Sequence, residues 1–348
     1  MNMKLLKFAL TMSVLITLVG GLSGCSTNTA ADNKNVKVRI ANFPNITHSQ
    51  ALVGRANGQF QKAFGESNAI EWKTFNAGPA EIEALFAGEV DIGYIGPGPA
   101  INGYTKSKGD LQIIAGATDA GAILVTRKDL VLKNVGELSG KRVAIPQFGN
   151  TQDLSLRHIL QENGLKDTTK GGTVEVRQAD NPDIKTLLEK GEIDAALVPE
   201  PWGARLVSEV QANILLDHKQ VWRDGNYTTA VVVARTQFIK EHPELIEKFL
   251  RTHVELTEYI NKNPEQGKEL INAQIKESTG KPLGKDILDA AFQRLTVTNN
   301  PEKDSIVDFV KLSVDAGFIK TAPDLKDLFN FKILNKILKE KGLKEIEN

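Results

Sequence analysis

The fold is decided by the segment Val36-Lys37-Val38-Arg39-Ile40-Ala41, which is followed by Asn42-Phe43-Pro44-Asn45-Ile46-Thr47. The first six residues alternate apolar and polar side chains, as the residues of a half-buried strand do. The next six contain turn formers and end on a residue that can cap a helix. Apolar residues at helical spacing then predict a helix from about His48 to Phe64. The segment therefore predicts a strand, a loop and a helix in succession.

The same alternation continues along the chain and predicts two α/β lobes. Each lobe is expected to be a mostly parallel sheet covered by helices, because parallel strands need helical crossovers. The division that we predict places 36–125 and 226–348 in the first lobe and 126–225 in the second. The strand at 228–234 would return the chain to the first lobe, and amphipathic helices follow it. The sequence shows no internal repeat of 20–50 residues.

Composition excludes several classes of protein. The chain has 348 residues, 41% hydrophobic and 25% charged, so it is neither disordered nor collagen-like. Its 43 basic and 43 acidic residues cancel, and no overall field attracts nucleic acid or acidic lipid. A single cysteine forms no internal disulfide, and the five histidines show no metal-ligand spacing. We expect no metal, no cofactor and no nucleic-acid partner.

The N-terminus has the features of an export signal. Lys4 and Lys7 precede an apolar run from Phe8 to Leu22, which is shorter than the roughly 20 residues of a membrane-spanning helix. The run closes on Leu22-Ser23-Gly24-Cys25, which resembles the bacterial lipobox. The resemblance implies a signal peptide over 1–24, a lipid on Cys25 and a flexible tether over 25–35. An uncleaved anchor with an incidental cysteine is the alternative. Cleavage would leave a formal charge of −2, because both lysines are lost.

Four loops lie at predicted strand ends and lead into helices, which is where open α/β sheets bind ligands. Their backbone N–H groups would point at an anion, with the positive end of a helix dipole behind them. The alternative is that their Gly, Pro, Asn and Thr residues only build turns and caps. The four loops are 42–48, 76–80, 96–99 and 147–153.

Further motifs resemble one family of proteins. They are Glu71-Trp72-Lys73-Thr74-Phe75-Asn76-Ala77-Gly78, Glu83-Ala84-Leu85-Phe86-Ala87-Gly88-Glu89-Val90-Asp91-Ile92-Gly93, Leu138-Ser139-Gly140-Lys141-Arg142-Val143-Ala144, Gly191-Glu192-Ile193-Asp194-Ala195-Ala196 and Pro199-Glu200-Pro201-Trp202. Together they resemble the substrate-binding proteins of bacterial importers for taurine, aliphatic sulfonates and nitrate. The resemblance implies a type II periplasmic-binding fold, in which two α/β lobes enclose the ligand.

The resemblance also implies which residues bind the ligand. Candidate ligand-binding residues follow from this family resemblance or from the four loops. They are Asn45, Thr47, His48, Asn76, Gly78, Gly98, Asn150 and Thr151. Asp119 is a further candidate. Relatives often carry Ser or Thr where this chain has Gly96-Pro97-Gly98-Pro99, so backbone N–H groups are the expected donors there, and the prolines have none.

Glu200 and Trp202 suggest an additional hypothesis about the ligand. A carboxylate facing an anion pocket suits a zwitterion whose ammonium group lies opposite its sulfonate, and Asp153 adds to this idea. Trp202 would stack on the ligand. The alternatives are that Trp202 is a core aromatic residue and that Glu200 is a first-turn acid stabilised by the helix dipole.

The resulting expectation is an extracytoplasmic, lipid-anchored receptor of an ABC importer. It would bind a small anion or zwitterion, most simply an aliphatic sulfonate, act as a monomer and pass the ligand to permease subunits in the membrane. Nitrate, a phosphonate or a thiamine pyrimidine precursor remain alternative ligands. A pyrimidine-synthase-like enzyme is the alternative of another class, but no catalytic residue is predicted and the only cysteine is used at the anchor.

Overall fold

The computed structural model describes residues 35–347 of the chain, and these form one compact unit. The predicted signal peptide over 1–24 and Cys25 lie outside the described residues, as does nearly all of the predicted tether over 25–35.

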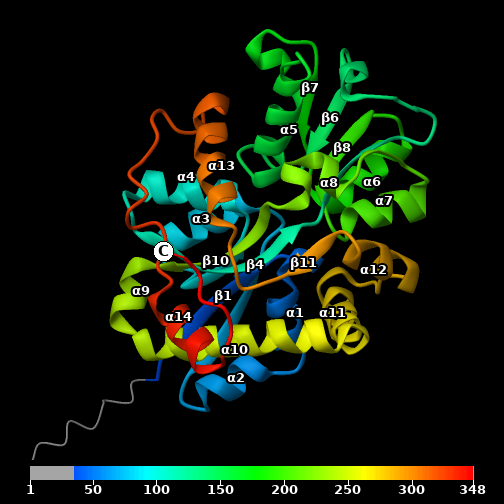
Figure 1. Ribbon diagram of the computed structural model, residues 1–348. Coiled ribbons are helices and arrows are strands. Elements are labelled where there is room, and N and C mark those ends of the chain that lie inside the picture. The colour runs from blue at the N-terminus through cyan, green and yellow to red at the C-terminus, as the bar shows by residue number, and fades with distance from the viewer. Residues whose placement is uncertain (1–34, 348) are drawn as a thin grey trace, which may run out of the picture. The chain divides into compact units, whose positions relative to one another are not determined.

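Strands and helices alternate through the first two thirds of this unit, and helices dominate the rest (Figure 1). The strands are β1 (Lys37–Asn42), β2 (Ala69–Thr74), β3 (Ile92–Ile95), β4 (Leu111–Ala120), β5 (Ala122–Thr126), β6 (Arg142–Ile145), β7 (Glu175–Gln178), β8 (Ala195–Pro199), β9 (Asn213–Leu216), β10 (Thr228–Arg235) and β11 (Leu295–Val297). The α-helices are α1 (Ser49–Ala56), α2 (Gln59–Phe64), α3 (Gly78–Phe86), α4 (Pro97–Ser107), α5 (Thr151–Glu162), α6 (Asn181–Glu189), α7 (Trp202–Val210), α8 (His218–Val221), α9 (Thr236–Glu241), α10 (Pro243–Lys262), α11 (Pro264–Thr279), α12 (Lys285–Phe292), α13 (Lys303–Ala316) and α14 (Lys332–Glu340). Short 3-10 helices are η1 (Ile46–His48), η2 (Val135–Leu138), η3 (Thr168–Lys170) and η4 (Arg223–Gly225).

The first sheet has the strand order β11-β4-β10-β3-β1-β2. β1 pairs in parallel with β2 and β3, whereas β10 runs antiparallel to both β3 and β4. Strands β1 to β4 therefore point the same way, and their carboxyl ends share one edge. The segment 228–234, predicted as a strand, forms β10 and lies inside this sheet between β4 and β3.

The second sheet has the order β7-β6-β8-β5-β9. β6, β7 and β8 are parallel, and β5 is antiparallel to β8 and β9. The fold is thus two mixed sheets in which most strands share one direction, as expected. The predicted lobe boundary after residue 125 cuts through β5, whose pairing belongs entirely to the second sheet. The strand β9 was not predicted.

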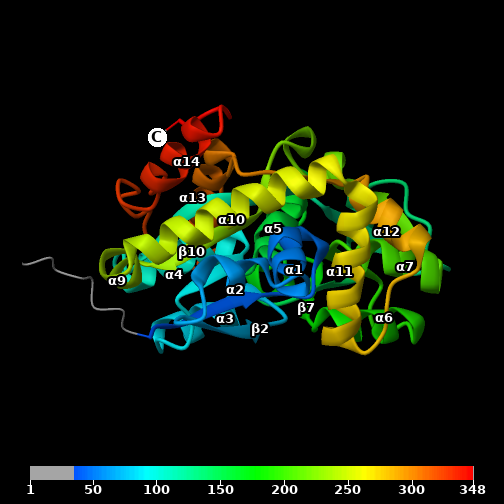
Figure 2. The ribbon, with the colours of Figure 1, turned by 90° about the horizontal axis from the view of Figure 1, so that it is seen from below.

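Helices cover both faces of the first sheet (Figures 1 and 2). α3 and α4 lie on one face, and α1, α2 and the long α10 lie on the other, with α11 and α14 packed beyond them. α13 contacts both α4 and α5, so it touches helices that belong to the two different sheets. No helix within residues 35–347 is long and apolar enough to cross a membrane.

The helix that we expected from His48 to Phe64 is interrupted. α1 ends at Ala56 and α2 begins at Gln59, with Gly58 between them at φ +67. A left-handed conformation is available to glycine at little cost and cannot continue a helix. The apolar spacing was correct on both sides of the break, but the prediction of one continuous helix was wrong.

The two sheets contain the same structural feature, an arginine bonded to an aspartate, and this shows that the fold has an internal repeat. Arg39 on β1 donates from its backbone N–H and from Nε to Oδ2 of Asp91, at 2.9 and 2.8 Å. Arg142 on β6 makes the same two hydrogen bonds to Asp194, both at 2.9 Å. Each aspartate returns a bond from its own N–H to the carbonyl of its arginine. Each Arg–Asp clamp spans 52 residues, and the two clamps lie 103 positions apart in the printed sequence.

The repeat shows where the halves have diverged. Glu81 of α3 corresponds to Ile184 of α6, and both side chains are fully buried. Glu81 packs against Gly93, where a Cβ would lie 1.8 Å from its Oε1. Neither carboxyl oxygen has a hydrogen-bond partner among the described residues. Burial raises the pKa of Glu81 well above its ordinary value, which favours the neutral acid.

We predict that Asp91→Asn destabilises the protein strongly. The Asp91 side chain is fully buried beside Arg39 and Arg235, and removal of one charge from a buried cluster leaves the others without compensation. The expected loss is about 3 kcal/mol of unfolding free energy, measured by guanidinium denaturation. Asp129→Asn is the control, because that carboxylate pairs with Arg127 but is 70% exposed, and it should cost less than about 0.5 kcal/mol. Equal effects of both changes would contradict the role of the clamp.

Candidate functional site

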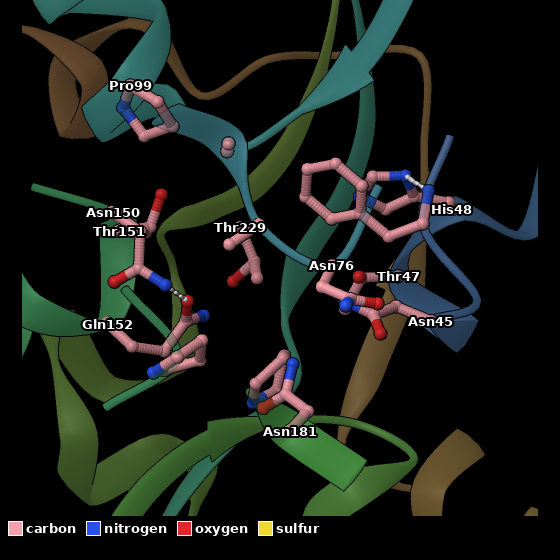
Figure 3. Close-up of a pocket in the computed structure, with 16 residues that line it drawn as sticks. Asn45, Thr47, His48, Asn76, Pro99, Asn150, Thr151, Gln152, Asn181 and Thr229 are labelled. Carbon is pink, nitrogen blue, oxygen red and sulfur yellow. Dashed lines mark hydrogen bonds between the residues drawn. The ribbon is translucent and has the colours of Figure 1, made fainter. Parts of the chain in front are cut away.

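A cavity lies where the carboxyl ends of strands from both sheets meet (Figure 3). From the first sheet come residues after β1, β2 and β3 and one residue of β10. From the second come residues after β6 and β7 and the last residue of β8. The volume of this cavity is about 20 Å³. The two halves are therefore closely apposed. The lining residues are Phe43, Asn45, Thr47, His48, Asn76, Ala77, Gly78, Gly96, Pro99, Pro146, Asn150, Thr151, Gln152, Asn181, Pro199 and Thr229.

Seven of the predicted binding residues line this cavity. The structure thus brings together residues as far apart in the chain as Asn45 and Thr151, which are 106 positions apart. These residues are Asn45, Thr47, His48, Asn76, Gly78, Asn150 and Thr151.

His48 is held as a neutral hydrogen-bond donor. Its Nδ1 accepts the backbone N–H of Phe43 at 3.1 Å, so the ring proton of the neutral form lies on Nε2. Complete burial lowers the pKa of His48 to about 3. The Phe43 and His48 rings lie 4.5 Å apart between centroids. No hydrogen bond within residues 35–347 uses Nε2, which leaves this N–H available to a ligand.

Asn45 is oriented by a residue of the second lobe. Its Oδ1 accepts a hydrogen bond from the indole Nε1 of Trp202 at 2.7 Å. The next residue, Ile46, donates its N–H to the carbonyl of Glu200 at 3.2 Å. With its oxygen engaged, Asn45 presents its amide nitrogen as the group that can bind a ligand. Trp202 therefore acts through Asn45, and it is not itself in the lining.

The start of α5 supplies donors from the second lobe. Asn150 caps this helix, because its Oδ1 accepts the N–H of Asp153 at 2.8 Å. Asn150 also donates to Oε1 of Gln152 at 3.2 Å, which leaves the Gln152 amide nitrogen free. The N–H groups of Thr151 and Gln152 belong to the first turn of the helix and have no intrahelical partner.

Two predicted residues contact the opposite lobe. Asn76 donates to Oδ2 of Asp180 at 2.8 Å. Gly98, which is outside the lining, donates its N–H to Oγ1 of Thr151 at 3.3 Å. A Cβ at Gly96 would lie 2.1 Å from the same oxygen. The expectation that Gly98 donates to an anion is therefore not met, because its N–H already has a partner. The glycines of this loop allow the lobes to approach each other.

Three predicted acids are engaged elsewhere. Glu200 is fully buried and accepts hydrogen bonds from Arg294 and from the N–H of Ala204, both at 2.9 Å. Burial is the main reason why its pKa is raised above the ordinary value. It does not line the cavity, so it cannot face an ammonium group there.

Asp119 and Asp153 also lie outside the lining. Asp119 accepts a hydrogen bond from Thr228 at 3.2 Å, and burial raises its pKa to about 8. Asp153 accepts from Gly149 at 2.8 Å and from Arg157 at 2.9 Å. These contacts leave neither side chain in the cavity lining, which removes Asp153 from the zwitterion hypothesis and Asp119 from the candidate binding residues.

Sequence reasoning missed several lining residues, above all Gln152, Asn181 and Thr229. Gln152 lies inside a loop that was predicted to bind ligand. Asn181 occupies the position equivalent to Gly78 in the structural repeat, a signal that becomes visible only once the Arg–Asp clamps are aligned. Thr229 lies on β10, and nothing in a buried strand distinguishes this hydroxyl in advance.

The lining contains no charged side chain. Amides and hydroxyls supply its polar atoms, and four helices of nine or more residues begin beside it: α3, α4, α5 and α6. Anions are favoured at such helix ends by the unpaired N–H groups and the dipole. No cluster of three or more metal-binding side chains occurs among residues 35–347.

Comparison with known proteins agrees with this geometry. A model of the NMT1-like family matches residues 31–275, about 70% of the chain. This chain belongs to the NMT1-like family. Among similar proteins is the taurine-binding periplasmic protein of Escherichia coli K12, which is 28% identical over 72% of this chain and 73% of its own length. A putative aliphatic sulfonates-binding protein of Bacillus subtilis 168 is 26% identical over 94% of this chain and 96% of its own.

Solved structures share the fold of this NMT1-like protein. The periplasmic nitrate-binding protein NrtA of Synechocystis PCC 6803 superposes with a TM-score of 0.75 at 15% identity, and the match covers 88% of this chain and 89% of that one. Binding of a solute, rather than catalysis, is the role that the relatives support.

We predict that Gly96→Ala shifts the protein toward an open form. Gly96 has φ −73, which any residue can adopt, so the new Cβ should affect only the contact with Thr151. Overpacking of this size costs about 1–3 kcal/mol, which changes the ratio of open to closed molecules about tenfold. Small-angle X-ray scattering should show a larger radius of gyration than for the unaltered protein. Adding Thr151→Ala should restore much of the compaction, and a failure to do so would contradict this contact as the cause.

Proposed function

We propose that this chain is the extracytoplasmic solute-binding protein of an ABC importer and that it binds an aliphatic sulfonate, such as taurine or an alkyl sulfonate. The observation that supports this most is the uncharged cavity at the starts of α3 and α5, where N–H groups of the first turn have no intrahelical partner. A small anion can be bound there by neutral donors with little desolvation of charged side chains. The relatives that bind taurine and sulfonates favour this chemistry among anions.

A sulfonate group fits the donors that remain unpaired. Its three oxygens accept hydrogen bonds, and the N–H groups at the starts of α3 and α5 approach from opposite lobes. The Nε2–H of His48 and the side-chain nitrogen of Gln152 add two donors. Because these groups belong to different lobes, ligand binding would favour closure. The closed pair of lobes would be the form that permease subunits recognise, and the protein would act as a monomer.

Nitrate is the second candidate, favoured by the small free volume of about 20 Å³. A sulfonate with a carbon chain needs the lobes to separate slightly, whereas nitrate needs less room. The same donors would accept its three oxygens. A pyrimidine finds less support, since Phe43 and His48 are the only aromatic rings in this lining and contact each other at an interplanar angle of 31°.

Isothermal titration calorimetry on the full chain in detergent tests the ligand. We expect binding of taurine or ethanesulfonate, and His48→Phe should weaken it about tenfold, because one hydrogen bond to a charged group is lost. Nitrate, methylphosphonate and a hydroxymethylpyrimidine serve as comparisons. If nitrate binds and no sulfonate does, the sulfonate assignment fails and the anion-binding role remains.

We further propose that a lipid on Cys25 holds the protein at the outer side of the cell membrane. The support is the order of basic residues, apolar run and small residues before Cys25. Two acyl chains hold a protein on a bilayer stably, where one chain does so marginally.

Cys25→Ser should move the protein from the membrane fraction to the soluble fraction and abolish labelling by a fatty-acid analogue. Thr27→Ala is the matched control and should leave both unchanged. Membrane retention of the Cys25→Ser protein would instead support the uncleaved apolar anchor.

A further inference from the structure

Asn181 is a buried side chain with an unused acceptor in the cavity. It is the first residue of α6 and only 4% exposed. Figure 3 shows it entering the cavity from the second lobe, opposite Asn76 and Thr47. Its Oδ1 has no hydrogen-bond partner among the described residues. A buried acceptor without a partner is destabilising, so this atom requires an explanation.

The fold itself does not require an amide at this position. The residue before it, Asp180, occupies the cap position of α6, and its carbonyl accepts the N–H of Asp183 at 2.8 Å. In the structural repeat, Gly78 stands at the equivalent start of α3 and has no side chain. The first lobe thus builds the same strand–helix connection without a polar group.

The other polar groups around the cavity are mainly donors, apart from the hydroxyl of Thr229, which has no partner among the described residues and can donate or accept. The amide nitrogens of Asn45 and Gln152 are free because their oxygens are engaged. Nε2 of His48 carries a proton, and the helix starts offer N–H groups. An anion composed only of acceptor atoms can satisfy these donors. It leaves Oδ1 of Asn181 without a partner when the lobes close.

We propose that Asn181 is a specificity-determining residue that accepts a hydrogen bond from an amino or hydroxyl group at the end of the ligand opposite the anionic group. This inference rests on the proposed binding of a sulfonate. It assigns the recognition of the ligand's donor end to a neutral amide, whereas the buried carboxylates Glu200 and Asp153 are already paired. The exposed carboxylate of Asp180 accepts a hydrogen bond from Asn76 and lies outside the lining.

Calorimetry on the full chain in detergent tests this proposal with three sulfonates of similar size. Taurine carries an amine, 2-hydroxyethanesulfonate a hydroxyl, and ethanesulfonate neither. The unaltered protein should bind the first two about tenfold more tightly than ethanesulfonate. Asn181→Leu should abolish that preference and leave ethanesulfonate binding unchanged or tighter. Asn181→Asp should raise the preference for taurine over ethanesulfonate, because a charged acceptor strengthens a bond to ammonium.

Asn134→Leu is the matched control, since Asn134 is exposed and outside the cavity lining, and it should change no affinity. Equal binding of taurine and ethanesulfonate by the unaltered protein would overturn the role of Asn181 and leave the sulfonate assignment intact. An equal loss of all three ligands in Asn181→Leu would also overturn it, because that pattern indicates a structural role. Binding of nitrate alone would overturn both proposals, since nitrate has no donor.

Discussion

The site depends on the clamp between an arginine of one strand and an aspartate that precedes the next parallel strand. Arg39 and Asp91 exchange backbone and side-chain hydrogen bonds, and these fix β3 against β1 in one register. Because side chains alternate along a strand, a slip of one residue would exchange the buried and exposed faces. Arg142 and Asp194 do the same for β6 and β8. The loops that follow these strands therefore emerge at fixed places, and the helix starts of both lobes converge on one cavity.

A second constraint is that the buried carboxylates near the cavity are paired with arginines before a ligand arrives. Glu200 is paired with Arg294, and Asp153 with Arg157. Burial lowers the pKa of His48 to about 3 and keeps its ring neutral. An anion then meets only dipoles and uncharged donors, whose desolvation costs far less than that of a charged side chain. Selectivity among anions in such a cavity comes from the number and direction of hydrogen bonds. The lining groups without a partner among the described residues, Oδ1 of Asn181 and the hydroxyl of Thr229, therefore matter most.

Most of the secondary structure could be predicted, because strands with alternating residues and helices with apolar spacing carry local signals. The break at Gly58 was missed, since a glycine inside a helical pattern has a left-handed conformation only where the packing requires it. The strands β9 and β11 are too short to show a period. The internal repeat was not predicted, although Gly88-Glu89-Val90-Asp91 and Gly191-Glu192-Ile193-Asp194 match closely. Its main shared feature is a pair of buried contacts between residues 52 positions apart, which a short matching segment does not reveal.

The sequence by itself determined the two α/β lobes, the four loops at the strand ends and seven of the residues that line the cavity. Each of these has a local cause in residue pattern or turn chemistry. Only the tertiary structure decided which polar groups remain free. Asn45, Asn150 and Gly98 have partners on other segments or in their own helix cap, and Asn181 has none for its Oδ1 among the described residues. Hydrogen bonds between distant segments cannot be predicted from the residues around a loop. The donors and acceptors that a loop offers to a ligand are those that the rest of the fold has not already bonded.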